Sequence, residues 1–242
     1  MTKKLSVKNI CKSFETLNGK TEVLKNISFE LDEGSFTVIA GENGAGKSLL
    51  MSIIAGLEEC DSGSIESFGK VGLVFQEAET QILGETPAED IAFGPKNLGW
   101  NNEKVASAVA NALEKTGLSD KKDSPARFLS GGEKRKLAVA CMLAMDLPLL
   151  ILDEPYANLD YSGVKQVNLL LKELKTAGKT IIILTHEIEK CLGLAERFIV
   201  LFKGEKVFDA APSEVMRQKT DLEKWNIRNP FNSYSSLEDL IW

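Results

Sequence analysis

The chain has 242 residues, of which 43% are hydrophobic, and a formal net charge of −6 at pH 7, so it is long enough for one large domain with a real core. The acidic balance argues against nucleic acid as the main partner, because phosphate backbones are bound by basic faces. The basic runs, such as Lys134-Arg135-Lys136, are short and are expected to be solvated surface.

Cysteine usage and hydropathy exclude two further classes. The four cysteines lie far apart and form no Cys-x-x-Cys pair, and there is a single histidine, so we expect no zinc site and a reducing cytosol. The N-terminal residues lack the apolar core of a signal peptide, and no apolar run approaches the ~18 residues that span a bilayer. We therefore expect that the chain crosses no membrane by itself.

The first 56 residues predict strands and then a helix. Residues 5–14, 26–31 and 35–40 are strand-like and are separated by turn residues at 18–19 and 32–34. This pattern favours an antiparallel β region that leads into a buried strand. Residues 48–56 have a helical apolar pattern, and Gly56 is placed to end that helix.

The middle of the chain is predicted to be helical from about residue 77 to residue 145. Residues 103–115 carry an apolar stripe that stops at Gly117, and a second helix is expected from about Ser130 through residue 145. We interpret this block as a helical insertion in the domain.

A strand, helix, strand order returns after residue 146. The continuous apolar runs at 147–154 and 180–187 are typical of parallel strands covered on both faces, and an amphipathic helix at 162–178 joins them. This order predicts a βαβ crossover. Residues 197–210 predict a hairpin around Lys203-Gly204. The polar end of the chain predicts a helix only near 212–223, so we expect the domain to end at 212 and a short tail to cover 213–242.

A glycine-rich segment, GENGAGKS at Gly41–Ser48, lies between the predicted strand and the predicted helix. It fits the G-x-x-x-x-G-K-[ST] pattern, in which glycines let successive backbone N–H groups point at an anion. The positive end of the following helix adds to that anion site. Lys47 is therefore expected to reach the β- and γ-phosphates of a nucleotide, and Ser48 to ligate Mg²⁺.

Two carboxylates end the first buried strand of the crossover. Asp153 is expected to bind Mg²⁺ directly or through water. Glu154 follows it, and a carboxylate there can orient and deprotonate an attacking water, which contributes roughly 10²–10⁴-fold in rate. In isolation Asp-Glu-Pro is an ordinary polar turn, but next to a phosphate loop it favours catalysis.

Three segments in this order resemble the nucleotide-binding subunit of ABC transporters: FLSGGEKRKLAVACML, LLILDEPYANLD and IIILTHE. The resemblance covers roughly residues 5–212. It implies an α/β P-loop NTPase of the ABC-ATPase fold, with a mostly parallel sheet, an N-terminal antiparallel β subdomain and a helical subdomain at about 77–145. It also implies ATP hydrolysis with ATP and Mg²⁺ at the site.

The resemblance adds further site residues. Gln76 matches the glutamine that links Mg²⁺ and water to the helical subdomain, and His186 matches the switch histidine on the γ-phosphate. Phe14 matches the aromatic that stacks on adenine, with ordinary core packing as the alternative. The predicted catalytic residues are Glu154, His186 and Gln76, and the predicted metal ligands are Ser48, Gln76 and Asp153. The predicted nucleotide-binding residues are Phe14, Gly41, Glu42, Asn43, Gly44, Ala45, Gly46, Lys47, Ser48, Leu49, Ser130, Gly131, Gly132 and Asp160.

The resemblance also implies a second ATPase subunit. Ser130, Gly131 and Gly132 match the signature loop, which contacts the γ-phosphate held by the other subunit, and Asp160 matches the loop that crosses the interface. Ser130 and Glu133 also form a capping-box pattern, which can serve the same helix at the same time. Two chains facing head to tail, either copies or paralogues, would complete two sites.

The segment EDIAFGPKNLG at 89–99 resembles the energy-coupling-factor group of importers, which take up vitamins and metal ions. That resemblance implies a transmembrane partner, a substrate-binding membrane protein and a peripheral position on the cytoplasmic face of the membrane. Ile82, Leu83, Ile91 and Phe93 lie where the family docks its membrane subunit, although they could also pack inside the helical subdomain.

Two other classes of function compete with membrane transport. A soluble ABC ATPase that acts on DNA or in iron–sulfur assembly is the alternative, and DNA-linked relatives carry a long coiled-coil insertion for which the interval 76–130 is too short. A non-hydrolysing regulatory module is disfavoured because every catalytic position is filled. Selectivity for the transported substrate would lie in other chains.

Overall fold

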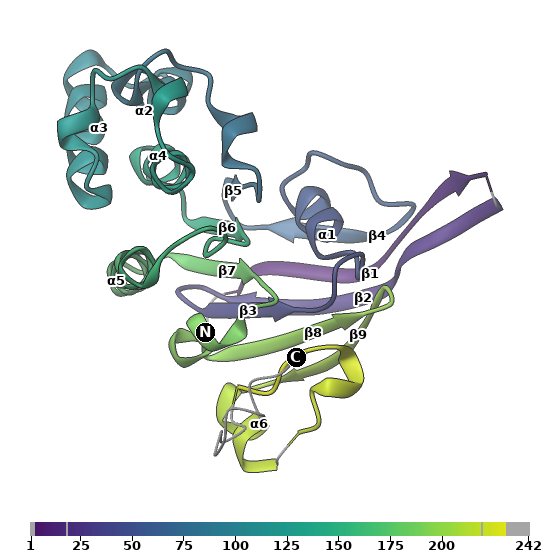
Figure 1. Ribbon diagram of the computed structural model, residues 1–242. Coiled ribbons are helices and arrows are strands. Elements are labelled where there is room, and N and C mark those ends of the chain that lie inside the picture. Colours follow the sequence, from purple (N-terminus) through teal and green to yellow (C-terminus); the bar gives the residue numbers. More distant parts are fainter. Residues whose placement is uncertain (1–2, 18, 219, 231–242) are drawn as a thin grey trace.

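The computed structural model describes residues 3–17, 19–218 and 220–230, and contains two β-sheets and a separate group of helices (Figure 1). The smaller sheet has the order β2-β1-β4 and is antiparallel. Its strands are β1 (Lys3–Thr16), β2 (Gly19–Asp32) and β4 (Ser62–Ser67). The predicted antiparallel N-terminal region is therefore confirmed.

The larger sheet has six strands in the order β5-β6-β7-β3-β8-β9. They are β3 (Phe36–Ala40), β5 (Val71–Val74), β6 (Leu149–Asp153), β7 (Thr180–Leu184), β8 (Arg197–Phe202) and β9 (Glu205–Ala210). Neighbouring strands are parallel except for β9, which forms the predicted hairpin with β8. The fold class is thus the expected α/β arrangement.

The predicted crossover is also present. β6 pairs directly with β7, and α5 (Tyr161–Thr176) connects them. Every residue of β3, β6 and β7 is buried, as expected for apolar strands that are covered on both faces. Because these strands are parallel, their carboxyl ends lie at one edge of the sheet, and the loops that follow them meet there.

The two faces of the larger sheet have separate cores. One core packs this sheet against β1, β2 and α1 (Lys47–Ile54). The other packs it against α5, part of α4 (Gly131–Ala144) and the end of the described chain. Ala45, in the loop between β3 and α1, belongs to the first of these cores, so packing holds the loop on that side.

The helical subdomain consists of α2 (Pro87–Asn97), α3 (Asn102–Thr116) and α4, with a small core of its own. Figure 1 shows these helices gathered at the β5 end of the larger sheet. α2, β4 and β5 are not among the predicted elements. Gly94 and Pro95 lie inside α2, and because both residues disfavour helices, the sequence pattern does not predict one here. Thr86 caps the start of α2 by accepting a hydrogen bond from Glu89 N–H.

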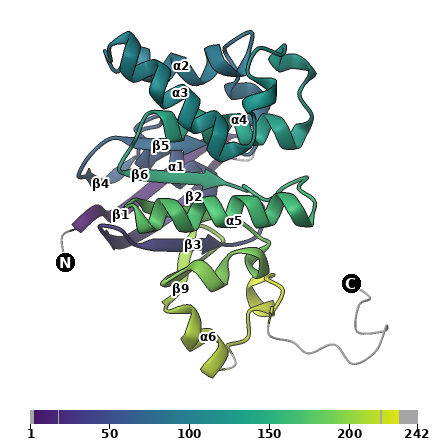
Figure 2. The same cartoon turned by 90° about the vertical axis from the view of Figure 1, so that its left-hand side faces the viewer.

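The chain continues past β9 into α6 (Pro212–Gln218), at the opposite end of the sheet from the helical subdomain (Figure 2). Val215, Leu222 and Ile227 are buried in the core of the larger sheet, and the Trp225 ring centroid lies 5.6 Å from that of Phe208. The domain boundary at 212 stays a prediction, and residues 231–242 of the predicted tail lie outside the described residues. Among the described helices, none has the length and apolar character to cross a bilayer.

Candidate active site

The glycine-rich loop joins β3 to α1 at the carboxyl edge of the sheet. Gly46 precedes the helix with φ 93°, and a Cβ at this position would lie 2.6 Å from Cδ2 of Leu24. A Cβ at Gly41 would lie 2.2 Å from the backbone oxygen of Leu201. Both positions therefore require glycine. No side chain caps α1, so its first-turn N–H groups are available to an anion.

The Lys47 side chain folds back over this loop. Its Nζ donates to the backbone oxygen of Gly41 at 2.7 Å and to that of Glu42 at 3.0 Å. Burial lowers the pKa of Lys47, while Glu154, Asp153 and Glu42 oppose that shift. The ammonium group is thus held by neutral acceptors in a mostly buried position, where an anion would be a stronger partner.

Ser48 and Asp153 meet across two segments that are 105 residues apart in the chain. The Ser48 hydroxyl donates to Asp153 Oδ2 at 2.6 Å. Burial raises the pKa of Asp153, and the Ser48 hydrogen bond works against this rise. A hydroxyl and a carboxylate side by side are oxygen ligands of the kind that Mg²⁺ takes.

The Glu154 carboxylate is buried, and both of its oxygens accept hydrogen bonds. Glu154 follows β6, and its partners follow the neighbouring strand β7. Oε2 accepts from Thr185 Oγ1 at 2.9 Å, and Oε1 accepts from the backbone N–H of His186 at 3.1 Å. His186 Nδ1 lies 2.7 Å from Oε1 and carries the proton of this bond, because an ionised carboxylate only accepts. The glutamate backbone is in the left-handed region at φ 48°, a strain of the kind found at functional sites.

A cavity of about 400 Å³ joins most of these groups. It brings together residues from the loop, from β6 and from the segment after β5, where Gln76 lies. Its lining residues are Val23, Asn43, Gly44, Gly46, Lys47, Ser48, Leu49, Gln76, Asp153 and Glu154. Apart from Val23, all of them are predicted site residues.

The signature loop lies elsewhere. Ser130 caps α4 by accepting from Glu133 N–H at 3.3 Å, and Glu133 accepts from Ser130 N–H at 2.8 Å, so the predicted capping box is confirmed. Ser130, Gly131 and Gly132 do not line the cavity that contains Lys47. The two halves of the predicted site are therefore separate within one chain.

Phe14 and Asp160 also lie outside that cavity. Phe14 is on β1, 42% exposed, with Lys12 Nζ 5.2 Å from its ring centroid. Asp160 caps α5 by accepting from Gly163 N–H at 2.7 Å, and this hydrogen bond is the main cause of its lowered pKa. Exposure leaves both side chains accessible to a partner, and neither contacts the phosphate loop residues in the described contacts.

One expectation about this region is wrong. Lys134-Arg135-Lys136 was expected to be solvated surface, yet Arg135 is only 6% exposed. Its guanidinium donates to the backbone oxygens of Gln76 and Glu154. Arg135 and Thr185 are the contacts of the site that sequence reasoning missed. The spacing of Arg135 from the apolar residues Leu137 and Ala138 does not settle which face of the helix it occupies. The hydrophobic pattern therefore gave little indication that Arg135 is buried.

The residues present fit a nucleoside triphosphate. The cradle for phosphates is formed by glycines at which a Cβ would clash, by the uncapped N-terminus of α1 and by the buried ammonium group of Lys47. The hydroxyl–carboxylate pair of Ser48 and Asp153 lies at its end. The fold and this site define a P-loop nucleotide-binding protein of the α/β class.

Comparison with known proteins gives the family. The ABC transporter family model matches residues 24–157. The chain is 35% identical to the energy-coupling factor transporter ATP-binding protein EcfA of Methanosphaera stadtmanae, over 96% of this chain and 87% of that protein. It is 38% identical to EcfA2 of Methanospirillum hungatei over 86% of this chain, but spans only 56% of that longer protein.

Solved structures agree with the sequence relatives. The chain superimposes on cbiO1 of Clostridium perfringens, part of the ABC transporter complex cbiONQ, with a TM-score of 0.79, 32% identity and coverage of 95% and 97% of the two chains. The dimeric ATP-binding cassette MJ0796 bound to ADP and Pi matches with a TM-score of 0.80 and 26% identity, over 86% and 98%. The chain belongs to the ABC transporter family, among its energy-coupling-factor-type ATP-binding subunits, and is an ATPase.

Proposed function

We propose that this chain is the ATP-hydrolysing subunit that powers import of a small molecule, a vitamin or a metal ion, through a membrane-embedded energy-coupling-factor transporter. The observation that carries the catalytic part is the buried Glu154 carboxylate, oriented by Thr185 and His186 beside the phosphate loop. The relatives named above support the transport part. The alternative of a soluble ATPase on DNA or in iron–sulfur assembly is not favoured.

The phosphate loop binds the triphosphate. Lys47 exchanges the carbonyls of Gly41 and Glu42 for phosphate oxygens, which are stronger acceptors for an ammonium group. Ser48 and Asp153, with Gln76 on the same cavity, would hold Mg²⁺. When bound, the metal neutralises charge on the phosphates.

Glu154 acts as general base for the attacking water. Its carboxylate is held at both oxygens, so it is fixed before substrate arrives, and fixing a base in position is a large part of its effect. His186 supports the γ-phosphate. The contact between its Nδ1 and Glu154 Oε1 fixes the orientation of the imidazole ring beside the base.

A second ATPase subunit completes the site. The signature residues 130–132 start α4 in the helical subdomain and are absent from the lining of the cavity around Lys47. In a head-to-tail pair, each signature loop faces the nucleotide of the other subunit and directs the N-terminus of α4 at the γ-phosphate. Asp160 and Phe14, both outside the cavity, are assigned to the subunit interface and to adenine.

The helical subdomain carries the membrane contact. Leu83 and Phe93 are 67% and 49% exposed, whereas Ile91 is buried in the subdomain core and Ile82 packs against it. Asp90 accepts from the N–H groups of Leu83 and Gly84 and so fixes the turn that presents Leu83. Two of the four predicted docking residues are thus available to a transmembrane partner on the cytoplasmic face, and two are structural.

The test is co-purification from intact membranes. The tagged chain should recover a hydrophobic membrane protein, and Leu83→Asp with Phe93→Asp should reduce that recovery while the melting temperature stays unchanged. Leu57→Asp, at another exposed leucine, is the matched control and should retain the partner. Recovery of the unmodified chain as a partner-free enzyme would contradict the transport assignment and favour the soluble alternative.

A further inference from the structure

Arg135 links three parts of the site from one buried position. It lies on α4, five residues after Ser130, and donates from Nη2 to the backbone oxygen of Gln76 at 2.6 Å and from Nη1 to the backbone oxygen of Glu154. One guanidinium therefore connects α4 with the segment after β5 and with the end of β6. Its planar fork holds both acceptors in a fixed relation.

The buried charge of Arg135 is better explained by positioning than by a contribution to stability. Burial lowers the pKa of Arg135, because it disfavours the charged guanidinium. The nearby carboxylates of Glu154 and Asp153 act against this shift. None of the ion pairs found between described residues involves Arg135, so backbone oxygens are its hydrogen-bond partners. An apolar side chain would fill a buried position at lower desolvation cost. A role in geometry accounts for the charge better than a role in packing.

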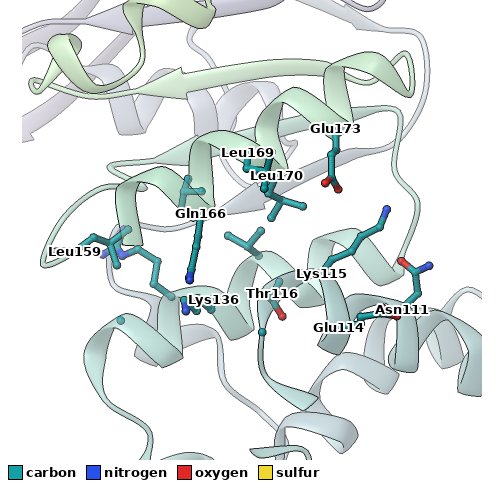
Figure 3. Close-up of a pocket in the computed structure, with 15 residues that line it drawn as sticks. Asn111, Glu114, Lys115, Thr116, Lys136, Leu159, Gln166, Leu169, Leu170 and Glu173 are labelled. Atoms are coloured by element: carbon teal, nitrogen blue, oxygen red, sulfur yellow. The ribbon is translucent and has the colours of Figure 1, made fainter. Parts of the chain in front are cut away.

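A cavity lies beside this residue, between the helical subdomain and α5. It has a volume of about 550 Å³ and lies between α5, α4 and the end of α3 (Figure 3). Arg135 lines it together with Gly132 and Leu159. Beside this cavity, the hydrogen bonds of Arg135 connect α4 directly to the backbones of Gln76 and Glu154.

The backbone of Glu154 is held at both its N–H and its carbonyl group. Its N–H donates to Leu184 O at 2.8 Å, its carbonyl accepts from Arg135, and its φ of 48° allows few alternatives. We infer that Arg135 is a positioning residue that sets the Glu154 and Gln76 backbones according to the position of α4, and so couples the helical subdomain to the base. The inference rests on the proposed role of Glu154.

The experiment uses the full chain and three variants. Arg135→Met removes both hydrogen bonds, Arg135→Lys keeps the charge but cannot bridge two carbonyls as a fork does, and Lys115→Met is the control, because Lys115 lines the same cavity. The readouts are kcat for ATP hydrolysis, the Kd of a fluorescent ATP analogue, the melting temperature and the His186 ring resonance. His186 is the only histidine in the chain, so its NMR signal is assigned without mutation and reports the position of the Glu154 carboxylate.

For Arg135→Met we expect kcat to fall about 10–100-fold, since small misplacements of a catalytic group cost up to ~10²-fold. The Kd should stay within about twofold, because Arg135 does not contact the phosphate loop. Arg135→Lys should be intermediate, and the His186 resonance should shift in both variants but not in Lys115→Met.

An unshifted His186 resonance and a kcat within twofold in the folded variants would overturn the inference. Should Arg135→Met fail to fold, Arg135→Lys decides by the same criteria. If the unmodified chain hydrolyses no ATP, the proposed function fails, while the resonance still tests the link between Arg135 and Glu154.

Discussion

Glu154 Oε1 and His186 Nδ1 lie 2.7 Å apart, although 32 residues separate them in the chain. The contact exists because β6 and β7 are adjacent and parallel, with Asp153 paired to Leu184, so the residues that follow both strands meet at one edge. The proposed base and the proposed switch residue are thus joined before any nucleotide binds.

Glu154→Gln should retain ATP binding and nearly abolish turnover, because an amide cannot take the proton of the attacking water. A loss of about 10²–10⁴-fold in phosphate release is expected. The variant should also accumulate as an ATP-bound dimer in size-exclusion chromatography, since hydrolysis no longer opens it. Undiminished phosphate release would rule out Glu154 as the base.

Lys47→Ala should weaken ATP binding by at least about tenfold, because the ammonium group of the cradle is lost. The measurement is the Kd for ATP by titration calorimetry in the presence of Mg²⁺. Lys172→Ala removes an exposed lysine of α5 and should leave the Kd unchanged. An unaltered affinity in Lys47→Ala would refute the assignment of the phosphate cradle.

Leu222→Ala tests whether the chain beyond α6 is part of the folded core. Leu222 is 0% exposed and belongs to the core of the larger sheet, so truncation should lower the free energy of unfolding by about 2–5 kcal/mol. Urea denaturation measures this change. Leu169→Ala, at a 61% exposed leucine, should cost less than about 0.5 kcal/mol. Equal effects at the two positions would show that residue 222 is not packed in solution.

Asp209→Asn should lower stability at pH 7 by about 1 kcal/mol, since the site is partly screened by solvent. Burial alone would raise the pKa of Asp209, but hydrogen bonds from Arg197 and Lys206 outweigh it and hold the pKa below its usual range. The folded state therefore binds this proton less readily than the unfolded state.

The stabilisation from Asp209 is accordingly present above the unfolded pKa of about 3.9 and is lost as the pH falls through the folded pKa. Unfolding of the two proteins should be compared from pH 7 to about pH 3. Their difference should shrink across the acidic end of this range. A difference that grows on acidification would contradict the assigned sign.

Several elements were predictable because their signals are local. The strand at Phe36–Ala40, the helix that ends before Gly117 and the capping box at Ser130 follow from hydrophobic period and cap chemistry. The crossover of β6, α5 and β7 follows from continuous apolar strands around one amphipathic helix.

Other elements depend on contacts that no local pattern records. No residue of β4 is buried, and this strand exists because it pairs with β1. α2 tolerates Gly94, where a Cβ would lie 2.4 Å from Met145 Sδ, because packing on α4 decides that position rather than helix propensity. Arg135 belongs to a basic run, and only its burial beside Gln76 and Glu154 distinguishes it from its neighbours.

The sequence by itself determined the chemistry of the phosphate loop, because glycines, a lysine and a serine at fixed spacing act within one turn of the chain. It also determined which strands are buried, since their side chains are apolar without interruption. Only the tertiary structure decided that Ser48 meets Asp153 and that Glu154 meets His186. It also decided that Arg135 is buried and that Val215, Leu222 and Ile227 complete the core. These contacts join segments far apart in the chain, and their distances are set by sheet order and packing rather than by sequence spacing.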